Sequence, residues 1–313
     1  MGIVKRSMHN RMHGRPYSLH RRAMDSHTYK MASSGLKSAA CLVFPLLLGA
    51  LMSSACLSTS TVRGRGRARQ TTIARNAMTD LEAHIFTDPG TGIELPYRLF
   101  VPTSCQVETP CGLLLFMHGA GERGRDNQAQ LANDALALIG PAAQQGNPTI
   151  VVYPQCPTDM QWVDVPWADG SYTLAQTPIS KPMAAALELL TSLQAKFAVD
   201  PRRILVTGLS MGGYGTWDIV ARHPTMFAGA LALCGGGDPS RAATTRNVPV
   251  WAFHGDSDPA VPVRASRKMI KALRAAGGNP RYTEVAGGGH DVWTVAYRDS
   301  AVLRWLLSQK RAP

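Results

Sequence analysis

The sequence has almost no acidic residues in its N-terminal part, and this shortage explains its charge. Of 33 Lys and Arg and 21 Asp and Glu in the chain, residues 1–75 contain 13 basic side chains and one acid, Asp25. The other 238 residues contain 20 of each sign, so the net charge of +12 belongs to the N-terminal segment. The larger part has no basic balance to attract phosphates, which disfavours a nucleic-acid-binding protein. Its length fits one large α/β domain better than two small ones.

Cysteine is scarce as well. The six cysteines include no Cys-x-x-Cys pair and no Cys/His cluster with the spacing of a zinc site. We therefore expect no metal. In an oxidising compartment Cys105 and Cys111 could close a short loop. Cys156 and Cys234 are expected to be buried thiols.

Long apolar runs are missing too. The apolar stretch 39–52 has 14 residues, fewer than the about 20 of a membrane-spanning helix, but it suits the core of a signal peptide. Small residues and Cys56 follow, and "SSAC" resembles a bacterial lipobox with Ser53 in the place where leucine is usual. We predict that residues 1–56 are a signal peptide or lipoprotein leader, of which 1–30 are a mis-called start or a long n-region. The protein is then exported, and a lipid on Cys56 is its one route to the membrane.

Arginine alternates with glycine in "RGRGRARQ", which follows the leader. This pattern is typical of an arginine-rich RNA-binding segment or of a solvated tether. An exported chain meets no RNA, so the tether is favoured. We expect a basic tether over residues 57–78 and one folded domain over residues 79–313.

From about residue 80, apolar runs alternate with helical patterns. The runs 112–119 and 149–155 are mostly apolar, as expected of strands buried on both faces. Between them, residues 127–140 have helical spacing that stops at Gly140-Pro141. Further strands are expected within 81–86, 95–102, 202–208, 228–236, 248–255 and 281–288, and helices within 181–197, 211–224, 265–277 and 299–310. The alternation predicts an α/β fold with a mostly parallel central sheet and helices on both faces. Ligands in such sheets bind at the carboxyl ends of the strands.

A single serine stands among glycines in "GLSMGGYG", directly after a predicted strand. Ser210 would end that strand and open a helix, which is the context of a nucleophile elbow. Gly212, Gly213 and Gly215 would each cost the helix about 1 kcal/mol relative to alanine. Close packing of the helix against neighbouring strands would explain them, whereas a flexible loop explains them less well.

A nucleophilic serine needs a base and an acid that orients the base. Asp258 lies 48 residues after Ser210 in "HGDSDPAVP", where Asp256 is the alternative acid. His290, in "GGGHDVW", is the only histidine after Asp258. Ser210, Asp258 and His290 each follow a predicted strand, in the chain order that the elbow fold requires. They are the candidate catalytic residues.

The oxyanion of such a reaction needs hydrogen-bond donors. One candidate is the backbone N–H of Met211, directly after the serine. The second is the N–H of Ala120, with Gly121 in reserve, in the glycine-rich "HGAGERG" that follows a strand. His118 is expected to be a structural residue of that loop.

The motifs "LPYRLFVP", "FMHGAGERG", "YPQCP", "GLSMGGYGTW", "FHGDSDPAVPV" and "GGGHDVW" together resemble the α/β-hydrolase fold. More narrowly, they resemble secreted carboxylesterases related to polyhydroxyalkanoate depolymerases and feruloyl esterases, a branch often labelled as predicted peptidases. The resemblance covers about residues 80–310. It implies that Asp258, the aspartate separated from "VP" by two residues, is the acid rather than Asp256.

The function expected from these residues is hydrolysis of carboxylic esters through an acyl-enzyme, without cofactor or metal. Small-molecule esters and esters attached to a polysaccharide or polyester are the expected substrates. One alternative is a serine peptidase similar to prolyl oligopeptidases, although the chain has no propeller-like domain to select peptides. Another is a silent scaffold used for binding, which would have no need of an intact triad.

The connections predict an open cleft without a large lid. Residues 236–247, where this fold commonly inserts a lid, are too few for covering helices. The longer segment 156–180 contains Trp162, Trp167 and Tyr172. These aromatics either pack under the segment or form a pocket wall for an aromatic acyl or sugar group. We therefore expect short-chain or aryl acyl groups rather than long-chain lipids.

Overall fold

The computed structural model describes residues 81–312. The predicted leader, the tether up to residue 78 and the lipobox at Cys56 lie outside the described residues. Eight strands form one open sheet in the order β1-β2-β4-β3-β5-β6-β7-β8. β2 pairs antiparallel with both β1 and β4, and all other neighbours are parallel. The strands are β1 (Glu82–Thr87), β2 (Glu94–Phe100), β3 (Cys111–Met117), β4 (Thr149–Pro154), β5 (Val199–Leu209), β6 (Gly229–Leu233), β7 (Val250–Gly255) and β8 (Arg281–Val285).

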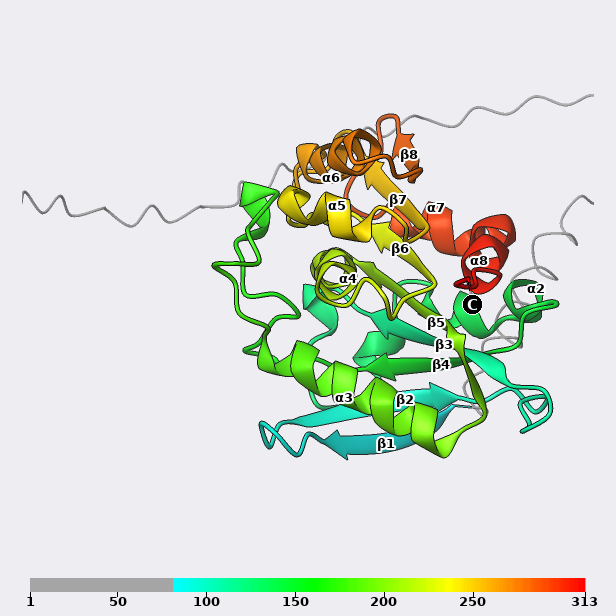
Figure 1. Ribbon diagram of the computed structural model, residues 1–313. Helices are drawn as coiled ribbons and strands as arrows, with labels where there is room; N and C mark the ends of the chain where they lie inside the picture. The colour runs from blue at the N-terminus through cyan, green and yellow to red at the C-terminus, as the bar shows by residue number, and fades with distance from the viewer. Residues whose placement is uncertain (1–80, 313) are drawn as a thin grey trace, which may run out of the picture. The chain divides into compact units, whose positions relative to one another are not determined.

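Helices cover both faces of this sheet. Figure 1 shows α3, α4 and α6 on one face and α7 and α8 with the short α2 on the other. The helices are α2 (Pro141–Gln144), α3 (Lys181–Lys196), α4 (Met211–Arg222), α5 (Ala242–Thr245), α6 (Arg264–Ala275), α7 (Trp293–Arg298) and α8 (Ser300–Leu307). The predicted α/β architecture is confirmed.

The central strands owe their apolar sequences to burial on both faces. Every residue of β3 is buried, and successive side chains enter opposite cores. Leu113 and Leu115 pack with α3 and α4, whereas Leu114 and Phe116 pack with α7 and α8. Burial of each such side chain contributes about 1.5–3 kcal/mol. These two cores fix the strand ends from which the candidate site is built.

The prediction of a helix over residues 127–140 is wrong. The structure has two 3-10 turns there, η2 (Ala129–Leu131) and η3 (Ala135–Ile139). Between them Asn133 and Asp134 adopt φ values of 57° and 61°, a left-handed conformation that a regular helix cannot contain. Pro141 begins α2 rather than ending a longer helix, since proline is tolerated at a first helical position. Helix α7 was not expected from the sequence.

The connections around the carboxyl ends of the strands contain little helix. Between β6 and β7 lie the 3-10 turn η5 (Pro239–Arg241) and the four-residue α5. Residues 156–180, all of which the structure describes, contain one 3-10 turn, η4 (Trp167–Asp169). Another turn, η1 (Ala120–Glu122), follows β3. Within residues 81–312, no helix is long and apolar enough to cross a membrane.

The four cysteines after residue 80 form the disulfide and the two buried thiols that the sequence predicted. Cys105 and Cys111 form a disulfide that closes the turn between β2 and β3. Cys156 and Cys234 are free and buried.

Candidate active site

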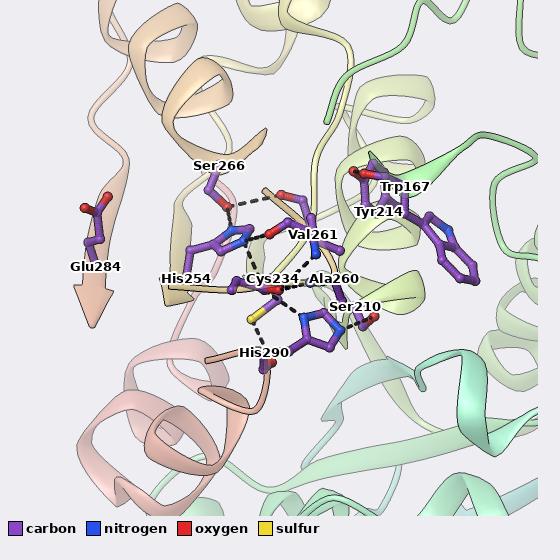
Figure 2. A network of polar contacts seen from close by, with 12 residues as sticks. Trp167, Ser210, Tyr214, Cys234, His254, Ala260, Val261, Ser266, Glu284 and His290 are labelled. Atoms are coloured by element: carbon purple, nitrogen blue, oxygen red, sulfur yellow. Dashed lines mark hydrogen bonds and ion pairs between the residues drawn. The ribbon is translucent and has the colours of Figure 1, made fainter. Parts of the chain in front are cut away.

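Three strand ends bring the predicted catalytic residues together. Ser210 directly follows β5, Asp258 lies in the loop after β7, and His290 lies in the loop after β8. His290 Nε2 is 2.8 Å from Ser210 Oγ, and His290 Nδ1 is 2.7 Å from Asp258 Oδ2. Figure 2 shows the imidazole of His290 between the serine and the loop after β7, which carries Asp258 and is called the acid loop below. The geometry can pass a proton from the serine hydroxyl to an imidazole that a carboxylate orients.

Ser210 lies in a strained turn, as a nucleophile elbow requires. Its backbone has φ 54° and ψ −115°, a region that residues other than glycine rarely adopt. Its own N–H donates to the carbonyl of Leu233 in β6, at 2.9 Å. A Cβ on Gly212 would collide with the carbonyl of Met117 in β3, and one on Gly213 with the carbonyl of Leu233. The glycines after the serine therefore allow α4 to lie directly against two neighbouring strands.

Asp258 accepts hydrogen bonds at both carboxylate oxygens. The backbone N–H groups of Ala260 and Val261 donate to Oδ1 at 2.8 and 2.9 Å, and the two imidazoles of His290 and His254 lie against Oδ2. Burial alone raises the pKa of this carboxyl group, but the hydrogen bonds outweigh burial and hold its pKa well below the usual range. The side chain is completely buried, yet these donors keep it ionised at neutral pH.

The alternative acid, Asp256, has its hydrogen-bond partners within turns. It is exposed, and its Oδ1 accepts from the Ser257 hydroxyl and from the N–H of Gly287. Its contacts are those of a residue that forms a turn. The structure therefore brings Asp258 and not Asp256 to His290.

Two further neighbours hold His290 in place. Its ring lies edge-on to Trp293, with ring centroids 5.1 Å apart. The thiol of Cys234, a residue with φ 49°, donates to the carbonyl of His290 at 3.3 Å. The side chain keeps 24% of its surface exposed, so a substrate and its leaving group can reach Nε2.

The two predicted oxyanion donors flank Ser210. Met211 is the first residue of α4, and the first N–H groups of a helix have no partner within the helix. Ala120 begins η1 directly after Gly119, and Gly119 lies so close to the serine that a Cβ on it would be 3.7 Å from the Cβ of Ser210. Arg123 Nε donates to the carbonyl of Ala120 at 2.8 Å, which holds the Ala120–Gly121 peptide of this turn.

His118 braces the same turn. Its Nε2 accepts from the N–H of Cys156 at 2.9 Å, so its Nδ1 carries the proton and donates to the carbonyl of Gly119 at 2.6 Å. Burial lowers the pKa of His118 to about 4, so the ring is neutral at pH 7. These contacts give His118 a structural position in the turn that carries Ala120.

The three aromatic residues proposed for the pocket have different surroundings in the structure. Trp162 is completely buried, and its Nε1 donates to the carbonyl of His118, so it packs inside the domain and the pocket-wall alternative does not hold for it. Tyr172 directs its hydroxyl to Asp218 Oδ1 on α4, at 2.8 Å. Trp167 is half-buried, and its carbonyl accepts from the hydroxyl of Tyr214 at 2.7 Å. Figure 2 shows Trp167 beside Tyr214.

A second histidine contacts the acid, and sequence reasoning did not identify it. His254 is completely buried at the end of β7, with Nε2 3.3 Å from Asp258 Oδ2. His254, Cys234 and Asp258 each offer one atom that could bind a metal ion, and these three atoms lie within 4.8 Å of one another. Each already has hydrogen-bond partners in the protein, so we interpret the cluster as a hydrogen-bond network. The string "HGDSD" contained the histidine, but only the folded loop shows that it faces the acid.

Comparison with known proteins identifies the family of this chain. The phospholipase/carboxylesterase family matches residues 103–301. A Salmonella typhimurium protein provisionally named carboxymethylenebutenolidase is 25% identical over 222 residues, which are 67% of this chain and 77% of its own length. Poly(3-hydroxyalkanoate) depolymerase C of Paucimonas lemoignei is 38% identical over 58 residues, 18% of this chain and 14% of its own.

Solved structures show the same fold. A thermostable esterase superposes with a TM-score of 0.69 at 37% identity, over 75% of this chain and 64% of its own. This chain thus spans less than two thirds of the length of that esterase. A ferulic acid esterase superposes with a TM-score of 0.55 at 20% identity, over 72% of this chain and 96% of its own, which supports the fold alone. The chain therefore belongs to the phospholipase/carboxylesterase family and is a carboxylic ester hydrolase with the α/β-hydrolase fold.

Proposed function

We propose that the protein is an exported serine esterase that cleaves its substrates through a covalent acyl-enzyme on Ser210. The observation that carries this proposal is the unbroken series of contacts from Ser210 Oγ to His290 Nε2 and from His290 Nδ1 to Asp258 Oδ2. A serine hydroxyl is a poor nucleophile unless a base accepts its proton and a third group orients that base. The strained backbone at Ser210 supports the same role.

In the proposed reaction, Ser210 Oγ attacks the carbonyl carbon of the ester while its proton passes to His290 Nε2. The carbonyl oxygen becomes an oxyanion, which the N–H groups of Met211 and Ala120 stabilise. His290 then gives the proton to the alcohol oxygen as the C–O bond breaks, and the acyl group stays on Ser210. A water molecule repeats the sequence and releases the carboxylic acid. Asp258 accepts from His290 Nδ1 throughout and stabilises the imidazolium.

We propose short or aryl acyl groups, free or attached to a polysaccharide or polyester, as the substrates. The short connection between β6 and β7 supports an open cleft, because η5 and α5 are too small to cover one. The half-buried indole of Trp167 supports an aromatic surface for the acyl or sugar group. The 58-residue likeness to a poly(3-hydroxyalkanoate) depolymerase supports a substrate attached to a polymer.

A panel of nitrophenyl esters from two to sixteen carbons tests this proposal, together with feruloyl esters and peptides. We expect fast turnover of acetyl, butyryl and feruloyl esters, slow turnover of long chains, and no increase in rate at an oil–water interface. Ser210→Ala should abolish the turnover, whereas Ser240→Ala, at an exposed serine, should leave it unchanged.

Three results would contradict the proposal. A preference for the longest chains that rises above their solubility limit would indicate a lipase. Faster cleavage of peptides than of esters would indicate a peptidase. Turnover that survives Ser210→Ala, or no turnover by the wild type, would remove the proposed chemistry altogether.

Export is a separate part of the proposal. The basic, apolar and small-residue order of residues 31–56 supports a cleaved leader. The Cys105–Cys111 disulfide is of the kind that forms and persists in oxidising compartments. Mass spectrometry of protein from its native host should find an N-terminus near Cys56 or a few residues beyond it, with added lipid if Cys56 is anchored. Active protein that retains Met1 would contradict export.

A further inference from the structure

His254 is an imidazole beside the candidate triad that the reaction proposed above does not use. It lies near the end of β7, four positions before Asp258, and its side chain is completely buried. Its Nε2 is 2.9 Å from the carbonyl oxygen of Val261 and 3.3 Å from Asp258 Oδ2. Its Nδ1 is 2.7 Å from the hydroxyl of Ser266 on α6. Figure 2 shows this second imidazole on the far side of the acid loop from Ser210.

The partners of His254 determine where its proton lies. A carbonyl and a carboxylate both accept, so Nε2 must carry a hydrogen and share it between Val261 and Asp258. The hydroxyl of Ser266 donates to Nδ1 when the ring is neutral. If Nδ1 is also protonated, the hydroxyl donates instead to the carbonyl of Gly235, which lies 3.1 Å away. In both states Nε2–H faces Oδ2, the same oxygen that accepts from His290 Nδ1.

The other titratable groups near His254 are either neutral or paired. Cys234, at the end of β6, is buried, and burial raises the pKa of its thiol well above its usual value. Glu284 is the register partner of His254 on β8. Its carboxylate accepts from Arg267 Nε of α6 at 2.8 Å and from the Tyr282 hydroxyl at 2.7 Å. Asp258 is thus the carboxylate that His254 contacts.

We propose that His254 is a positioning residue for the ester hydrolysis, acting on His290 through Asp258. The carbonyl of Val261 accepts from His254 while the N–H of Val261 donates to Asp258 Oδ1, so His254 fixes the acid loop. A second donor on Oδ2 also makes the carboxylate a weaker partner for the imidazolium of His290. His254 therefore weakens the stabilisation of protonated His290, which extends activity toward lower pH. This inference rests on the proposed function.

The variant His254→Leu, whose side chain has no donor, tests the proposal through the pH profile. Loss of the imidazole leaves Oδ2 to His290 alone, so the carboxylate stabilises the imidazolium of His290 more strongly. We expect the acid limb of kcat/KM to move up by about half to one pH unit, less than loss of a direct hydrogen bond to a charged group would give, because His254 acts on His290 through Asp258. We also expect kcat to fall several-fold with KM unchanged, because His254 does not contact the substrate.

Ser266→Ala is the matched control. It removes a buried hydrogen bond from the same imidazole but leaves Nε2–H facing Asp258. It should lower Tm and leave the acid limb where it is in the wild type. An unshifted acid limb in His254→Leu, or equal shifts in both variants, would assign His254 to packing alone and overturn the proposal.

A measurement on the wild type can overturn the proposal even if His254→Leu fails to fold. In ¹⁵N-histidine-labelled protein, Nε2 of His254 should carry a proton across the pH range of activity, with contacts to Val261 and Ser266 identifying the resonance. A bare Nε2 with a protonated Nδ1 would overturn the proposal. Absence of ester hydrolysis in the wild type would instead refute the proposed function, so the two failures are distinguishable.

Discussion

Replacement of Asp258 by asparagine should disable the base without removing a side chain from the loop. Four N–H groups surround the carboxylate of Asp258, two from the backbone and two from imidazoles, and each needs an oxygen that accepts. If the amide NH₂ occupies the place of Oδ2, it faces the N–H groups of His290 and His254. His290 must then shed its Nδ1 proton and carry one on Nε2, where it can no longer accept the proton of Ser210. If the amide turns over, its NH₂ faces the backbone N–H groups of Ala260 and Val261 instead. Backbone amides cannot give up their hydrogens whereas an imidazole can change tautomer, so the first orientation is favoured.

The expected loss follows from this forced tautomer. An imidazole with a hydrogen on Nε2 is not a general base, so kcat should fall about 10³–10⁴-fold, which corresponds to about 4–5.5 kcal/mol of transition-state free energy. Asp256→Asn is the matched control two residues away. Its side chain is exposed and serves a turn, so kcat should change less than about twofold.

The same substitution should alter stability with a defined sign. Hydrogen bonds lower the pKa of Asp258 in the folded state, so its ionised form stabilises the fold above about pH 4. That contribution is lost as the pH falls toward the lowered pKa. Asp258→Asn should therefore flatten the pH dependence of the unfolding free energy below about pH 4.

Steady-state kinetics on butyryl nitrophenyl ester and urea unfolding between pH 3 and 7 provide both readouts. Substantial activity in Asp258→Asn, combined with its loss in Asp256→Asn, would move the acid to Asp256 and refute the reasoning. Equal losses in the two variants would show that the loop, and not the individual carboxylate, is what matters.

Three further predictions concern the scaffold. Gly212→Ala should destabilise the fold by about 3 kcal/mol or more because the new Cβ meets backbone, whereas Gly90→Ala, with ordinary contacts, should be nearly neutral in denaturant unfolding. Tyr172→Phe should lower the unfolding free energy by about 1–3 kcal/mol through the lost bond to Asp218; an unchanged Tm would mean that this contact does not anchor segment 156–180. Reduction of Cys105–Cys111 should destabilise the fold by about 2 kcal/mol, and equal Tm values with and without reductant would contradict a native disulfide.

Local sequence signals predicted the features that depend on neighbouring residues. The apolar run of β3 required burial on both faces, and the structure buries all of it. The glycines after Ser210 required close packing, and the carbonyls of Met117 and Leu233 provide it. The chain order of Ser210, Asp258 and His290 was visible because the fold places each at a strand end. Their catalytic roles stay predictions.

Features that depend on the folded chain were beyond the sequence. The helical spacing of residues 127–140 gave no sign that Asn133 and Asp134 adopt left-handed conformations and divide the segment. The contact between His254 and Asp258 arises because the loop after β7 turns back on the strand end. Whether Trp162 packs or lines a pocket depended on the path of a long segment, and the structure buries the ring completely.

Covalent trapping of the nucleophile is the sharpest test of an acyl-enzyme on Ser210. The protein would be treated with a fluorophosphonate, and digested peptides would be analysed by mass spectrometry while ester hydrolysis is followed in parallel. We predict one adduct per chain, on Ser210, with activity lost in proportion to labelling and no adduct in Ser210→Ala. An adduct on a different residue, or ester hydrolysis that persists in fully labelled protein, would contradict the proposed mechanism.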